Sequence, residues 1–168
     1  GSPYAAAPVG ALGWHAPAPV AGWTGTRDAT GYGNDCVQSR MPGDVANSNQ
    51  PMSEDCLFLN VWTPQPRAGA RLPVMVYIHG GGFSTGSGSA AILDGTRLAA
   101  RGVVVVTLNY RLGRFGFFAT PPLTREAAGG ATGNWGLMDQ IAALDWVRRN
   151  IAVFGGDAAN VTVFGESA

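Results

Sequence analysis

The sequence contains no lysine, only two histidines and only two cysteines among its 168 residues. Eleven arginines balance eleven acidic residues, so no positive field attracts nucleic acid or an anionic membrane surface. No apolar run reaches the roughly eighteen residues that a membrane-spanning helix needs. We interpret the missing lysine as a coding bias. The hydrophobic content of 46% remains that of a globular domain with a core.

Two cysteines are too few for a zinc cluster, and no Cys-x-x-Cys redox spacing occurs. Cys36 and Cys56 are separated by nineteen residues rich in Gly, Pro, Asn, Ser and Asp. The spacing allows two free thiols or one disulfide that closes a loop. A disulfide would remove ~3 kcal/mol of unfolded-state entropy and would indicate an oxidising compartment. We expect neither a metal nor an organic cofactor.

The first part of the chain, residues 1–56, holds most of the turn-forming proline and glycine, which predicts loops and short edge pieces. Its opening, "GSPYAAAPVGALGW", has no basic n-region and no apolar h-region, so we do not interpret it as a signal peptide. The chain has no internal repeat and no low-complexity linker. We therefore expect no domain boundary.

Strands are predicted after Cys56, at 57–63, 73–79, 103–110 and 161–165. The second and third are nearly continuous apolar runs, which is typical of strands buried on both faces of a sheet. Together with the helices expected between them, they predict an α/β fold with a mainly parallel sheet. In such sheets reactive groups lie at the carboxyl ends of the strands.

Two helices are predicted between these strands. The first covers 90–102 and ends at a glycine suited to a C-cap. The second begins at Trp135 after Asn134, whose side chain can cap it. Its apolar residues recur at helical spacing and predict one buried stripe, made of Leu137, Ile141, Leu144, Val147 and Ile151.

The loop after the 73–79 strand reads "HGGGF", from His79 to Phe83. Three glycines let the backbone approach a ligand and turn its N–H groups inward, as an oxyanion hole requires. A flexible surface connection is the plain alternative, because glycine runs are common in loops.

The last strand runs into "GES", Gly165 to Ser167. A serine on a sharp turn after a buried strand exposes its Oγ above the sheet, and small neighbours permit that turn. Alone this half motif is weak. A nucleophile elbow and a glycine-rich oxyanion loop belong to one site, however, so the pair of motifs predicts a serine hydrolase.

The sequence resembles the type B carboxylesterases, which include cholinesterases and para-nitrobenzyl esterases, within the α/β-hydrolase superfamily. The resemblance covers nearly the whole chain, and its most specific parts are "EDCLFLNVWTP" (54–64) and "FGGDAANVTVFGES" (154–167). It implies an α/β-hydrolase fold truncated after the nucleophile elbow, so that residues 1–168 form the amino-terminal part of an incomplete domain.

The resemblance also implies roles for single residues. Ser167 would be the nucleophile that forms an acyl-enzyme, and Gly81, Gly82 and Ala168 would donate the oxyanion hydrogen bonds. Glu166 would be an auxiliary carboxylate rather than the acid of the triad. Cys36 and Cys56 would form the family's first disulfide, which favours a secreted or periplasmic protein.

Neither histidine suits the role of general base. His79 opens the glycine loop, which we expect it to hold in place, and His15 lies in the proline-rich opening, where we expect it at the surface. In this superfamily the acid and the histidine follow the serine in the chain. We therefore expect both beyond residue 168 and expect these 168 residues alone to be inactive.

The expected substrate is a small carboxylic ester. Residues 44–56 lack the tryptophan with which cholinesterases contact a quaternary ammonium, so a general or para-nitrobenzyl ester fits better than a choline ester. The alternative is a non-catalytic binding or adhesion protein of the same fold. Such relatives typically lack the serine or an oxyanion donor, whereas Ser167, Gly81 and Gly82 are all present.

Overall fold

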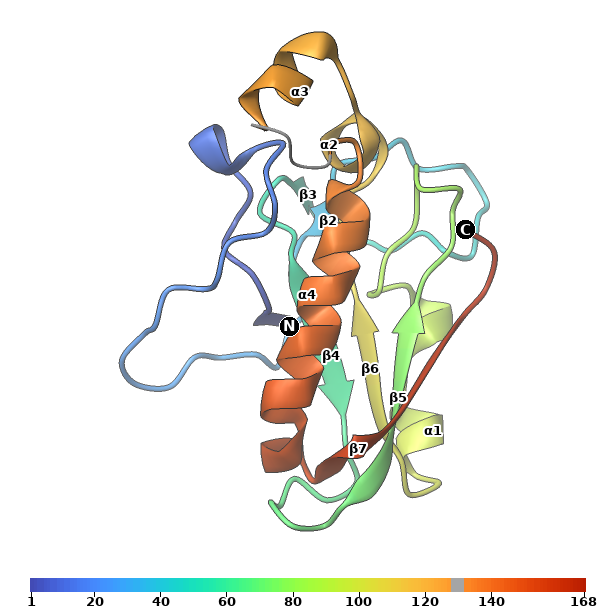
Figure 1. The fold of residues 1–168 in the computed structure, drawn as a ribbon. Helices are drawn as coiled ribbons and strands as arrows, with labels where there is room; N and C mark the ends of the chain where they lie inside the picture. The colour runs from blue at the N-terminus through green and yellow to red at the C-terminus, as the bar shows by residue number, and fades with distance from the viewer. Residues whose placement is uncertain (128–131) are drawn as a thin grey trace.

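The structure, a computed structural model, describes residues 1–127 and 132–168. Its centre is a five-stranded sheet with the strand order β1-β4-β6-β5-β7 (Figure 1). In chain order the strands are β1 (Ser2–Pro3), β4 (Phe58–Trp62), β5 (Leu72–Ile78), β6 (Val104–Leu108) and β7 (Gly156–Gly165). β5 pairs in parallel with β6 and β7, whereas β4 is antiparallel to both β6 and β1. The predicted mainly parallel centre is confirmed.

The middle of the sheet is built from the apolar runs. All five residues of β6 are buried, and Val74 and Val76 of β5 are fully buried beside it. A central strand that is covered on both faces exposes neither face to water. Its side chains are therefore apolar throughout and do not alternate between apolar and polar. These strands hold the loops that follow them in fixed positions.

Several short helical segments surround the sheet, and one is long. In chain order they are η1 (Gly10–Leu12), η2 (Ala91–Leu93), α1 (Thr96–Ala99), α2 (Gly113–Phe117), α3 (Pro121–Glu126), α4 (Trp135–Asn150) and η3 (Ile151–Phe154). Figure 1 shows α4 crossing in front of the sheet. No helix in the described part of the chain is long and apolar enough to cross a membrane.

The prediction of one helix over 90–102 is wrong, because η2 and α1 are separate turns. The side chain of Asp94 accepts a hydrogen bond from the Thr96 N–H at 2.8 Å, which stabilises a turn between η2 and α1. Gly95 lies against Trp62, where a Cβ atom would come within 2.8 Å of the indole ring. The chain breaks its helix there to pack closely on β4.

The prediction for α4 is correct in position, and its buried stripe is correct in part: Val147 and Ile151 are buried and Leu144 packs against the core, as predicted. Leu137 and Ile141 are 40% and 66% exposed, and the buried side chains of α4 are those of Trp135, Gly136, Asp139, Ala143 and Val147. Small residues let the helix come close: a Cβ on Gly136 would lie 2.5 Å from the Arg111 carbonyl oxygen. Asn134 is the N-cap residue, but its side chain makes no capping hydrogen bond.

The first 56 residues are loops with short strands, as predicted. β2 (Asp35–Cys36) and β3 (Met52–Ser53) form a separate two-stranded parallel sheet, and a disulfide joins Cys36 to Cys56. The buried Asp35 carboxylate accepts hydrogen bonds from Arg40 at 2.8 Å and from Ser48 and Ser87 at 2.6 Å each. These charge-assisted bonds connect the loop region to the segment that follows β5.

Candidate active site

The two predicted site loops leave the sheet side by side. β5 and β7 are separated along the chain by β6, yet they pair directly, and Ile78 lies opposite Gly165 in the register. The "HGGGF" loop begins one residue after Ile78, and the serine turn begins at Gly165. The parallel register therefore brings both loops to the same edge of the sheet.

Ser167 has the backbone geometry of a sharp, strained turn. Its φ is +60°, in the left-handed region that residues with a side chain rarely adopt. The residue is exposed. Two residues earlier, a Cβ on Gly165 would lie 2.5 Å from the Ile78 carbonyl oxygen, so only glycine fits at the start of the turn. A strained turn of this kind, directly after a strand, is the backbone geometry on which hydrolases expose a serine.

Gly80 brings the two loops into contact. A Cβ on Gly80 would lie 2.4 Å from the Glu166 carbonyl oxygen and 2.9 Å from the Ser167 Cβ. The absence of a side chain at this position is what allows the serine turn to approach the loop. Gly80 was not among the predicted site residues, because no signal in one sequence distinguishes the first of three glycines from Gly81 and Gly82.

The next two glycines shape the loop. Gly81 has φ +116°, and its carbonyl oxygen accepts bonds from the N–H groups of Ser84 and Thr85 at 3.0 and 3.1 Å. The Gly82 N–H donates to an oxygen of Ala168, and the Phe83 N–H donates to the same oxygen at 3.3 Å. The structure thus brings Gly82, Ala168 and Ser167 together, with a loop N–H directed at an oxygen atom beside the serine.

His79 holds the loop from below. It is buried with 4% of its surface exposed, and its ring stacks on Tyr110 with centroids 4.4 Å apart. Its Nδ1 lies 2.7 Å from the Gly80 carbonyl oxygen, which can only accept, so Nδ1 carries the proton. The Tyr110 hydroxyl donates to the His79 carbonyl oxygen at 2.8 Å. Burial lowers the pKa of His79 to about 4, so the ring is neutral at pH 7.

The serine opens into a cavity of about 480 Å³. Its lining includes His79 and Tyr110 from the inner side and Leu137 and Gln140 from α4. Leu137, which the sequence predicted as a core residue, is therefore part of this wall. The surface around Ser167 is more apolar than polar, as small-molecule sites are.

Glu166 is exposed, and its side chain forms no hydrogen bond with Ser167 or with a histidine among the described residues. Its charge has one recorded effect: burial, and after it the negative charge of Glu166, raises the pKa of Tyr77. This is a nearby electrostatic role. Within residues 1–127 and 132–168, the side chains of Glu166 and Ser167 form no hydrogen bond with each other.

His15 lies elsewhere. It is exposed, as predicted, and its Nδ1 is 2.7 Å from the Gly13 carbonyl oxygen. In the part of the chain that the structure describes, neither histidine is hydrogen-bonded to Ser167, and no cluster of His, Cys, Asp and Glu side chains could hold a metal ion.

One buried ion pair was not predicted. Arg111 and Asp139 are 3% and 0% exposed; the Arg111 Nε and NH2 atoms donate to the two carboxylate oxygens at 2.8 and 2.7 Å, and the Arg111 backbone N–H adds a third bond at 3.0 Å. Burial raises the pKa of Asp139, and the bonds from Arg111 oppose that effect. The pair attaches α4 to the segment directly after β6.

The fold and this site geometry define the class. A mainly parallel sheet, a glycine-rich loop after β5 and a strained serine turn after β7 are the parts of the α/β-hydrolase fold. A solved thermophilic para-nitrobenzyl esterase superposes with a TM-score of 0.89 at 49% identity, covering 99% of this chain and 34% of that one.

The family follows from the sequence comparisons. The model of the Carboxylesterase family matches residues 1–168, and the chain belongs to that family. Its relatives include the fumonisin B1 esterase of Sphingopyxis macrogoltabida and the para-nitrobenzyl esterase of Bacillus subtilis (strain 168), each 50% identical over the whole of this chain. The cholinesterase of Mus musculus is 46% identical. This chain spans 31%, 34% and 28% of those three relatives.

Proposed function

We propose that this chain carries the nucleophile and the oxyanion loop of a serine carboxylesterase. Ser167 attacks the carbonyl carbon of a carboxylic ester, the alcohol leaves, and water hydrolyses the acyl-enzyme. The single observation that carries this proposal is the left-handed φ of +60° at Ser167, on a turn held against Gly80. Strain of this kind persists where the surrounding structure over-determines it, and it is concentrated at functional sites.

The oxyanion role rests on the loop. The N–H groups of Gly81 and Gly82, with that of Ala168 after the serine, would bind the negative oxygen of the tetrahedral intermediate. The Gly82 N–H lies close to the serine turn, since it donates to the backbone oxygen of Ala168, and this proximity supports the proposal. Each such donor is worth ~3 kcal/mol in the transition state.

We also propose that the general base and its acid lie outside these 168 residues. His79 is neutral, buried and bound to Gly80, and His15 lines a different cavity from Ser167. A serine without a base is a poor nucleophile. The 168-residue chain, as an incomplete domain, would therefore hydrolyse esters no faster than its own Ser167→Ala variant.

The proposed substrates are general carboxylic esters of small size. The apolar wall of the cavity and the relatives named for para-nitrobenzyl and fumonisin B1 ester hydrolysis support this range. The disulfide between Cys36 and Cys56 supports an extracellular or periplasmic location, because such bonds persist in oxidising compartments.

The test uses the protein expressed from the complete gene. We expect it to hydrolyse para-nitrophenyl butyrate and to react with a fluorophosphonate, with the phosphonyl group found on the peptide that contains Ser167. A protein that neither hydrolyses the ester nor takes up the label would instead be a non-catalytic member of this fold. Label on another serine would contradict the assignment of the nucleophile.

A further inference from the structure

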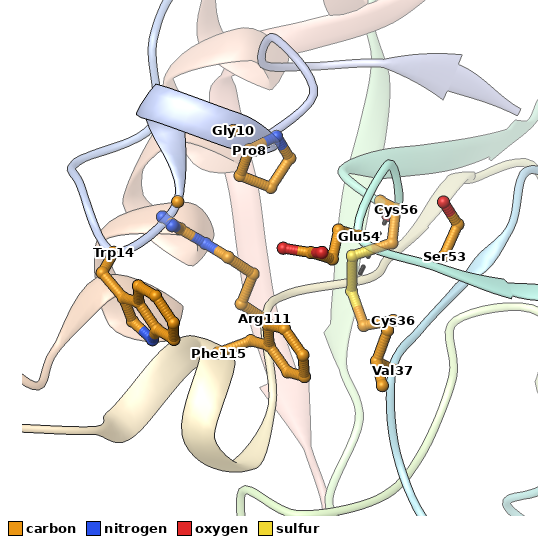
Figure 2. Close-up of a pocket in the computed structure, with 11 residues that line it drawn as sticks. Pro8, Gly10, Trp14, Cys36, Val37, Ser53, Glu54, Cys56, Arg111 and Phe115 are labelled. Atoms are coloured by element: carbon orange, nitrogen blue, oxygen red, sulfur yellow. Dashed lines mark hydrogen bonds between the residues drawn. A yellow bond between two sulfur atoms is a disulfide. The ribbon is translucent and has the colours of Figure 1, made fainter.

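A second cavity, of about 270 Å³, lies apart from the one that contains Ser167. Four segments that are distant in the sequence form its wall: the 8–14 loop, residues 36–37, residues 53–56 and the start of α2 (Figure 2). The two cavities share no lining residue in the described part of the chain. The proposed esterase chemistry does not use this second cavity.

The Arg111 side chain lines the second cavity, and its guanidinium group is held rigidly. Its Nε and NH2 atoms are bound to Asp139, and NH2 also donates to the His15 carbonyl oxygen at 2.8 Å. The remaining nitrogen, NH1, is buried and has no hydrogen-bond partner among the described residues. Because the other bonds fix the guanidinium, NH1 is an unsatisfied donor in a set position, and a buried donor favours any acceptor that reaches it.

The Glu54 side chain supplies the opposite chemistry. Figure 2 shows its carboxylate directed toward the side of the cavity that Arg111 and Trp14 form. This carboxylate forms no ion pair or hydrogen bond with the described residues, 1–127 and 132–168. Asp139 already balances the charge of Arg111, so Glu54 leaves the cavity with a negative charge. That charge favours a cationic group on a ligand.

Two aromatic rings complete the wall, those of Trp14 and Phe115. Trp14 has φ +52°, an unusual value for a bulky residue, and its Nε1–H donates to the Arg114 carbonyl oxygen at 2.8 Å. The bond from Arg111 to His15 holds the next residue of the same loop. The indole is therefore held in place as an apolar surface beside Arg111 (Figure 2).

We propose that this cavity binds a small molecule with an aliphatic α-aminoacyl group, that is, an amino acid or its amide. The ammonium group would lie on Glu54, the adjacent carbonyl or carboxylate oxygen would accept from Arg111 NH1, and the aliphatic part would contact Trp14 and Phe115. The volume is near the lower end for small-molecule sites, which fits a ligand of this size. The site is independent of Ser167.

The first experiment is isothermal titration of the protein from the complete gene with L-leucinamide and with L-leucine. We expect saturable binding of at least one, and the stronger of the two identifies whether a carbonyl or a carboxylate oxygen is the better acceptor. 4-Methylpentanamide, which lacks the amine, should bind at least about 10-fold more weakly, a loss of ~1.4 kcal/mol. If neither amine binds, or if 4-methylpentanamide binds equally well, the proposal is wrong.

Variants then locate the site. Glu54→Gln, at an exposed position, should weaken L-leucinamide binding at least about 10-fold. The matched control is Asp55→Asn. It also removes one negative charge, but the Asp55 side chain does not line the cavity. Equal losses in both variants, or an unchanged Glu54→Gln, would overturn the assignment.

A third variant fills the cavity. Gly13 lines it with φ −61°, which a side chain tolerates, and its nearest non-local neighbour for a Cβ is the Gly10 carbonyl oxygen at 3.2 Å. Gly13→Leu should abolish L-leucinamide binding and leave ester hydrolysis unchanged. Full binding in Gly13→Leu would place the ligand elsewhere. Because hydrolysis is measured separately, failure of this site and failure of the proposed esterase are distinguishable.

Discussion

The two cavities are separate, although the consecutive residues Tyr110 and Arg111 line one each, and they are built by different means. Around Ser167 the arrangement depends on the backbone: glycines without side chains and a residue with positive φ. Around Arg111 it depends on side-chain charge, with a buried ion pair that fixes one donor. An added methyl group should therefore damage the first region, whereas removal of a charge should damage the second.

The largest effect is expected at the serine itself. In the protein from the complete gene, Ser167→Ala should lower kcat/KM for para-nitrophenyl butyrate by at least about 10⁴-fold, because no other group can form the acyl-enzyme. The exposed Oγ contributes little to packing, so the midpoint of thermal unfolding should not change. Ser39→Ala, at another exposed serine, is the control. If Ser167→Ala lowered kcat/KM only slightly, Ser167 would not be the nucleophile.

The charge-built region is tested by Asp139→Asn. The substitution keeps the shape and leaves the Arg111 charge buried without its counter-ion, which typically destabilises a protein by about 3–5 kcal/mol. Chemical denaturation measures the free energy of unfolding. Asp145→Asn on the same helix is the control, because its pairs with Arg148 and Arg149 are exposed and it should change stability little. If both variants lost a similar free energy of unfolding, the buried ion pair of Asp139 would contribute no more to stability than the exposed pairs of Asp145.

The two regions should also differ in their response to pH. The pKa of His79 is about 4 in the folded chain and about 6.5 when unfolded, so between these values the unfolded chain binds more protons. Stability from this residue is complete above pH 6.5 and is lost as the pH falls toward 4, by up to about 3 kcal/mol at about 1.4 kcal/mol per pKa unit.

His79→Asn is the matched variant for this pH dependence. Its amide can still donate to the Gly80 carbonyl oxygen but does not titrate. The difference in unfolding free energy between wild type and variant should therefore shrink as the pH falls from 7 to 4.5. A difference that stays constant over this range would show that His79 has the same pKa in the folded and the unfolded chain.

The smallest of these effects distinguishes two glycines of one loop. In Gly80→Ala the new methyl group meets the Glu166 carbonyl oxygen and Ser167, and we expect a loss of kcat/KM of about 10²-fold from displacement of the nucleophile. In Gly82→Ala no atom lies within 4 Å of the new Cβ, so only the strain of φ +59° is added, about 1–2 kcal/mol. Equal losses in kcat/KM would mean that close approach is not what Gly80 provides.

The strands and both site loops could be predicted from the sequence because their signals are local. An apolar run such as 103–110 carries its own evidence for burial, and a serine turn or a glycine run is visible where it stands. For α4, periodicity correctly predicted that Val147 and Ile151 are buried, but it was wrong for Leu137 and Ile141. The buried face also contains Gly136, Ala143 and the charged Asp139, which a count of apolar residues does not select.

The unpredicted parts depend on pairs of distant residues. Asp139 is acceptable in the core only because Arg111, 28 positions earlier, reaches it. Gly80 matters only because Glu166 and Ser167 lie against it. Nothing in a single sequence marks these residues as partners, because they come into contact only in the folded structure.

The contact between the first and the central strands limits the order in which the chain can fold during synthesis. The hydroxyl group of Tyr4, next to β1, donates a hydrogen bond to the Asn109 carbonyl oxygen, 105 residues further along the chain. At about 5–20 residues per second, a ribosome needs on the order of 5–20 seconds to make that partner. During this interval the opening segment has no sheet to join, while Cys36 and Cys56 have both emerged. The disulfide can therefore form first and shorten the loop that must later be closed.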